Sequence, residues 1–98
     1  MTREVSLLIN NQPIKLDYFV QGFIDHTTSG ILAGLEGVGK IESADVSIEG
    51  DEVTINVNNT LIPINPFVNK IIRRTILGMV SSLKGVGEIN KVNIIIKR

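Results

Sequence analysis

The sequence predicts one α+β domain over residues 1–98, in which two helices pack on one face of an antiparallel sheet. Three observations predict it: the chain matches itself at a fixed offset, several short segments alternate apolar and polar residues, and two longer segments have helical periodicity. The predicted unit is a strand–strand–helix–strand repeat that occurs twice in tandem, at 4–49 and 52–97. The two repeats are expected to be related by a pseudo-twofold axis.

The internal repeat is visible without any gap. When the chain is shifted by 48 positions, 16 of 46 aligned residue pairs between 4–49 and 52–97 are identical, whereas chance gives about three at typical residue frequencies. The triplet Gly37-Val38-Gly39, for example, returns as Gly85-Val86-Gly87. Two copies are too few for a solenoid, so we expect a compact domain.

The strands are predicted from apolar residues at every second position, the pattern of a half-buried strand. Asn10-Asn11 and Asn58-Asn59 follow the first strand of each repeat, and asparagine tolerates the left-handed backbone of a tight hairpin turn. The predicted strands cover residues 4–9, 13–16, 42–49, 52–57, 61–64 and 90–97.

Each helix is predicted from its start and stop signals. Asp17 and Asn65 are good N-cap residues, and Pro66 suits the first helical position, where no N–H is needed. Gly37 and Gly85 are placed as left-handed C-terminal caps. The predicted helices cover 18–36 and 66–84.

An apolar stripe along each helix is expected to face the core. Beside the stripes lie small residues, among them Gly30, Gly34 and Gly78. Because glycine within a helix costs about 1 kcal/mol relative to alanine, we expect the two helices to compensate by packing closely together along these residues. The stripes contain Val20, Phe23, Ile24, Thr27, Ile31 and Leu35, and in the second repeat Val68, Ile71, Ile72, Thr75, Met79 and Leu83.

The net charge is zero, but residues 1–49 sum to −4 and residues 50–98 to +4. Three interpretations remain open: opposite charges that face each other across the pseudo-twofold axis, drift on solvated surfaces, and head-to-tail association between the acidic and basic halves. The pairs with reversed sign are Asp25/Arg73, Glu36/Lys84, Glu49/Lys97 and Lys40/Glu88.

A basic face on the second helix is the candidate partner or anion surface. It consists of Lys70, Arg73, Arg74, Leu77 and Lys84. Such a face attracts nucleic acid, anionic lipid or an acidic protein, although zero net charge and few aromatic residues argue against nucleic acid. A solvated or internally paired face is the alternative. Exposure of Ile76, Leu77 and Val80 would favour a partner surface.

No catalytic, metal or cofactor site is predicted. His26 is the single histidine and is expected at the surface, and a pairing with Asp25 and Ser29 would need a geometry that the sequence does not indicate. Leu35–Lys40 and Leu83–Glu88 are similar to the hairpin of helix-hairpin-helix DNA-binding modules. Because strand-like alternation follows both segments, they are expected to be helix-to-strand turns.

The composition bears on location. The chain contains no cysteine, which fits a reducing compartment. No signal peptide is expected at Met1, and no apolar segment approaches the length of about 20 residues needed to cross a bilayer. A cytoplasmic protein is therefore expected.

The second repeat resembles the bacterial alkaline-shock protein family. The residues that carry the resemblance are Ile62-Pro63, the segment Ile71–Leu83, Gly85 and Val92-Asn93-Ile94. The resemblance implies a non-enzymatic protein that is tied to cell-envelope stress and to protein–protein contacts. It implies no catalytic residues.

Together, these features predict a small non-enzymatic domain that acts as a structural or protein-interaction module, through a protein partner or self-association in a homo-oligomer. The alternative is an anion-, nucleic-acid- or lipid-binding domain that uses the basic face of the second helix.

Overall fold

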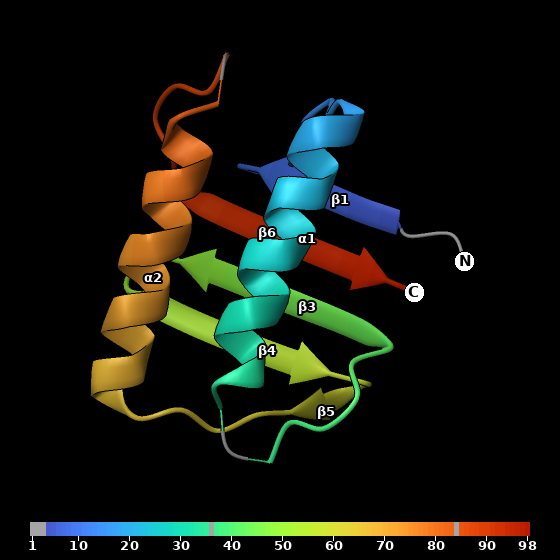
Figure 1. The fold of residues 1–98 in the computed structure, drawn as a ribbon. Coiled ribbons are helices and arrows are strands. Elements are labelled where there is room, and N and C mark those ends of the chain that lie inside the picture. The colour runs from blue at the N-terminus through green and yellow to red at the C-terminus, as the bar shows by residue number, and fades with distance from the viewer. Residues whose placement is uncertain (1–3, 36, 84) are drawn as a thin grey trace.

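The computed structural model describes residues 4–35, 37–83 and 85–98 as two layers, a sheet and a pair of helices that cover one of its faces (Figure 1). The helices run antiparallel, so the start of each lies beside the end of the other (Figure 1). The α+β class and the placement of the helices are as predicted. The elements are β1 (Glu4–Ile9), β2 (Gln12–Pro13), α1 (Tyr18–Ala33), β3 (Ser43–Glu49), β4 (Glu52–Val57), β5 (Thr60–Leu61), α2 (Pro66–Ser81) and β6 (Lys91–Lys97).

Within the described residues, the sheet has six antiparallel strands in the order β2-β1-β6-β3-β4-β5. The long closing strands β3 and β6 lie side by side at its centre, with Val46 opposite Ile94. The hairpin β1–β2 pairs with β6, from the other half of the chain, and the hairpin β4–β5 pairs with β3. Each half therefore completes the sheet of the other.

The alternation predicted for the strands is confirmed by burial. On the long strands the side chains that face the helices are buried, apart from the half-buried Val5 on β1. Among them Leu7, Val46, Ile55 and Ile94 are each 1% exposed. Burying one such aliphatic side chain contributes about 1.5–3 kcal/mol. This aliphatic layer is the core to which both helices attach.

The second strands are shorter and begin earlier than predicted. Asn10 and Asn11 have positive φ values of 53° and 66°, which make a two-residue hairpin turn, so pairing resumes immediately with Ile9 opposite Gln12. The equivalent turn at Asn58 places Val57 opposite Thr60. The predicted strands 13–16 and 61–64 are therefore wrong by one position at the start and three at the end.

The N-caps are confirmed, while the helix ends are not. Oδ1 of Asp17 accepts a hydrogen bond from the Val20 amide, and Oδ1 of Asn65 accepts one from the Val68 amide, both at 2.8 Å. The helices end at Ala33 and Ser81 instead of 36 and 84, positions that lie outside the described residues.

Shorter-range bonds terminate each helix. The amide of Leu35 donates to the carbonyl of Leu32, three residues back, which tightens the final turn. Gly37 and Gly85 do adopt the predicted left-handed backbone, with φ of 82° and 81°. They lie in the turn toward the next strand, however, and do not cap the helices.

The helices are rotated relative to the predicted stripes. Phe23 is 54% exposed and Ile71 is 47% exposed, although both were expected in the core. The rotation has a geometric cause: each helix buries the side against the sheet, and its predicted stripe faces partly into the space between the helices. The buried helical residues are Ile24, Asp25, Thr28 and Leu32 on α1, and Ile72, Ile76 and Val80 on α2.

The expected close contact between the helices is wrong. A Cβ atom added at Gly30 or Gly78 would meet no neighbouring atom within 4 Å. The small residues therefore do not serve helix–helix packing, and the cost of glycine at these helical positions is not offset by such a contact.

Candidate protein-interaction surface

Exposed apolar side chains gather on the helical layer. Of the large apolar residues that the described structure leaves exposed, all but Leu61 belong to α1 or α2. Phe19 and Phe67 are 73% and 68% exposed. Single exposed apolar residues are normal on a protein surface, whereas a concentrated group marks an interaction site. The helical group is Tyr18, Phe19, Phe23, Phe67 and Ile71.

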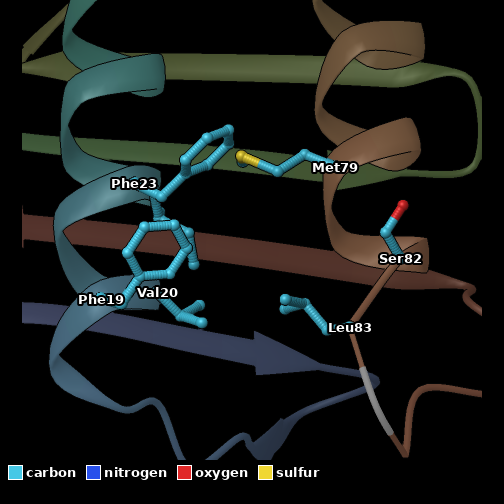
Figure 2. A pocket seen from close by; sticks show the side chains of 7 residues that line it. Phe19, Val20, Phe23, Met79, Ser82 and Leu83 are labelled. Carbon is cyan, nitrogen blue, oxygen red and sulfur yellow. The ribbon is translucent and has the colours of Figure 1, made fainter.

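An apolar hollow of about 430 Å³ lies between the start of α1 and the end of α2 (Figure 2). Phe19 and Phe23, four residues apart on α1, form one wall, with ring centroids 6.1 Å apart. Met79 and Leu83 form the other wall, and the Met79 thioether points toward the Phe23 ring (Figure 2). The complete lining is Phe19, Val20, Phe23, Ile24, Met79, Ser82 and Leu83.

Ser82, the one polar side chain of this lining and the C-cap of α2, has its hydrogen-bond partner in α2. The Ser82 hydroxyl donates a 2.9 Å hydrogen bond to the Gly78 carbonyl. Methionine, which is flexible and polarizable, adapts to differently shaped apolar groups. The hollow is therefore suited to apolar side chains and offers little for a polar substrate.

The predicted basic face is only partly assembled. Lys70 and Arg74 are exposed and lie one helical turn apart on α2, but Leu77 is half-buried against the core. Arg73 is occupied: its Nε donates to the Gly50 carbonyl at 2.8 Å, and its Nη2 lies 3.6 Å from Asp51 Oδ1. Lys84 lies outside the described residues.

Two further residues of α2 bear on this interpretation. Ile76 and Val80 are fully buried, so the exposure that would have favoured a partner surface beside the basic residues does not occur. Lys70 and Arg74 instead share their exposed strip with Phe67 and Ile71, at spacings of three, four and seven residues that place side chains on one helical face.

Asp25 is a buried acid that the sequence did not predict. Its Oδ1 accepts hydrogen bonds from Arg98 Nη2 at 2.6 Å and from the Ser29 hydroxyl at 2.8 Å. Arg98 Nη2 also donates to Ser29 Oγ at 2.8 Å. These hydrogen bonds connect α1 to Arg98, the residue that follows β6.

The ion pairs do not support charge compensation across an axis. Asp25 pairs with Arg98 where Arg73 was expected, and Glu49 pairs with Lys91, at 3.7 Å, where Lys97 was expected. The expected pair Glu36/Lys84 lies outside the described residues.

The structure also places His26 and the two segments that resemble DNA-binding hairpins. His26 is exposed, as expected, and the Ser29 hydroxyl donates to Asp25. The segments after Leu35 and Leu83 lead into β3 and β6, which confirms helix-to-strand turns. Across 4–35, 37–83 and 85–98, no three metal-ligating side chains are grouped to hold a metal ion. In the same part of the chain, neither helix is long and apolar enough to cross a membrane.

No family model, curated protein or solved structure matches this chain. The resemblance to the alkaline-shock protein family therefore stays a prediction.

Proposed function

We propose that the chain is a non-enzymatic protein-interaction module whose contact surface is the helical layer. The observation that carries the proposal is the group of exposed apolar residues on α1 and α2, two of which, Phe19 and Phe23, line the hollow between the helices. A partner that covered these side chains would gain about 25 cal/mol of binding free energy for each Å² of apolar surface removed from water.

The architecture that supports this surface is, in our proposal, a duplicated half-size unit with pseudo-twofold symmetry. Every element of the second half begins and ends 48 positions after its counterpart in the first. The contacts also recur: Asn10 bonds the start of β6 as Asn58 bonds the start of β3, and Asp25 contacts residue 98 as Arg73 contacts residue 50. Unrelated halves would not be expected to share these contacts.

The sheet edges support a contact through the helices. The edge strands β2 and β5 have two residues each, and short edge strands discourage strand addition by other chains. β5 pairs with the end of β4. At the start of β4, the Asn69 side chain bonds the backbone instead: it accepts from the Val53 amide and donates to the Asp51 carbonyl.

We further propose that the protein acts in the cytoplasm, since its cysteine-free sequence suits a reducing compartment. The anion-binding alternative has less support than the protein-interaction surface. With Arg73 occupied and Leu77 half-buried, the described part of the predicted face offers only Lys70 and Arg74.

Site-specific photo-crosslinking tests the proposed surface in cells that express the chain. A photoreactive phenylalanine analogue replaces Phe23 or Phe67 in the helical layer, or Leu61 on β5 as the matched exposed control. We expect discrete protein adducts from Phe23 and Phe67 and none of the same mass from Leu61. Equal adducts from the three positions, or none, would contradict the proposal.

A further inference from the structure

The helical layer has a one-sided charge pattern. Within the described helical residues 18–33 and 66–81, the exposed basic side chains are His26, Lys70 and Arg74. The single acid there, Asp25, is buried and pairs with Arg98. Asp17, the N-cap just before α1, is an exposed acid whose Oδ1 accepts from the Val20 amide. Lys70 and Arg74 lie beside Phe67 and Ile71 on α2, so a complementary partner carries acids next to the apolar residues that cover this part of the surface.

The hollow lies at one end of the helix pair, between the start of α1 and the end of α2. Each helix has 16 residues and is therefore about 24 Å long. Phe67 and Ile71 are exposed near the start of α2, at the other end of the pair. A partner helix presents anchors at i, i+3 or i+4, and i+7 along one face, so one such helix can place an anchor in the hollow and continue over Phe67 and Ile71.

We propose that the helical layer receives an amphipathic helix of another protein, with an apolar face that fills the hollow and acidic residues next to Lys70 and Arg74. This inference rests on the proposed function and specifies the class of partner.

A second copy of the chain fits the surface less well. A twofold dimer joins the same patch from both molecules, and residues 18–33 and 66–81 of that patch offer Lys70 and Arg74 no exposed acid. The exposed acid next to α1, Asp17, already accepts from the Val20 amide as the N-cap. A head-to-tail contact would have to continue into a ring or filament. An acidic helix meets neither difficulty.

A membrane surface is also less suited. Near an anionic bilayer each lysine or arginine contributes about 1 kcal/mol, and the exposed surface of the described helices provides two such residues. A bilayer surface would cover the layer, yet the hollow between Phe23 and Met79 fits a projecting side chain.

The test is a selection from a phage-displayed library of helical peptides. Leucine or phenylalanine is fixed at i, i+3, i+7 and i+10, and the edge positions vary among glutamate, glutamine and lysine. We expect peptides rich in glutamate to be recovered. Their affinity is expected to fall about tenfold or more in Phe23→Ser and in Lys70→Glu with Arg74→Glu. The matched controls Leu61→Ser and Lys15→Glu, also at exposed positions, are expected to keep it.

The contrary outcomes separate the two proposals. If glutamine- and lysine-edged peptides are recovered equally and still depend on Phe23, the contact surface stands and the acidic partner is wrong. If no recovered peptide depends on Phe23, or if none is recovered, both proposals are wrong.

Two parallel measurements identify other occupants and would overturn the proposal of an acidic helix. A concentration-dependent mass that Phe23→Ser abolishes indicates a second copy. Phe23-dependent binding to phosphatidylglycerol vesicles without peptide recovery indicates lipid.

Discussion

Oδ1 of Asn10 accepts a 2.7 Å hydrogen bond from the backbone amide of Asn90, 80 positions further along the chain. The same side chain accepts from the Lys91 amide at 3.0 Å and donates to the Glu88 carbonyl at 2.8 Å. The first hairpin is thereby fixed to the strand that closes the second half. Asn58 makes the equivalent bonds to the start of β3.

Replacing either asparagine is expected to be similarly costly. Asn10→Ala and Asn58→Ala each lose these bonds, worth about 0.5–1.5 kcal/mol apiece, and place alanine at a positive φ, which costs about 1–2 kcal/mol. We expect the free energy of unfolding in urea to fall by about 2.5 kcal/mol or more in each variant. Asn11→Gly is the control, since glycine accepts the φ of 66° there. A large loss in one variant and none in the other would contradict the equivalence of the halves.

The buried acid gives a second prediction. Asp25→Ala leaves Arg98 without its carboxylate, and Arg98→Ala leaves the buried carboxylate without its cation. Breaking a buried pair costs about 3–5 kcal/mol, although the partial exposure of the Arg98 side chain, 30%, favours the lower end. The more exposed pair of Lys91 and Glu49 serves as the control, and Lys91→Ala is expected to cost no more than about 1 kcal/mol. Equal costs for the two pairs would show that the Asp25 contact is not special.

Two helical glycines should be replaceable with a gain. Gly30→Ala and Gly78→Ala add a methyl group that meets no neighbouring atom within 4 Å, so we expect each to raise the free energy of unfolding by about 0.5–1 kcal/mol. Gly37→Ala is expected to lower it, because φ is 82° at that position. A loss of stability in Gly30→Ala would instead indicate a close helix contact.

The exposed aromatic residues should matter little for folding. Phe23→Ser is expected to change the free energy of unfolding by less than about 1 kcal/mol, since the ring is more than half exposed. Its neighbour Ile24 is fully buried, and Ile24→Ala is expected to cost about 2–5 kcal/mol. Thermal and urea unfolding of both variants measure the difference. If Phe23→Ser proved as costly as Ile24→Ala, Phe23 would belong to the core.

The sequence predicted the strands well because alternation has a physical cause in a sheet with one buried face. Leu7 and Ile9 are buried where alternation placed them. Alternation says nothing about which strand is the neighbour, so the pairing of β1 with β6 was not predicted. The helix starts were predictable for a similarly local reason, since a cap such as Asp17 bonds an amide three residues on.

Helical periodicity alone could not predict the exposed apolar surface on the helices. Phe23 and Ile24 are both apolar and adjacent, so helical periodicity does not distinguish the residue that faces the sheet from the one that faces a partner. Asp25 was missed because its cation, Arg98, is 73 positions away, and no local pattern indicates such a contact. The sequence placed Arg73 on a basic face but could not show its contacts with Gly50 and Asp51, because these depend on the turn between β3 and β4.

The most direct test of the central claim is an NMR titration of the full chain with a glutamate-edged helical peptide from the selection. The Met79 methyl in the hollow and the exposed Ile71 methyl near the start of α2 report on the helical layer, while the exposed Leu61 methyls report on the sheet edge. We expect saturable shifts at Met79 and Ile71 with Leu61 unchanged. Shifts confined to Leu61 and the sheet, with Met79 and Ile71 unmoved, would contradict the claim.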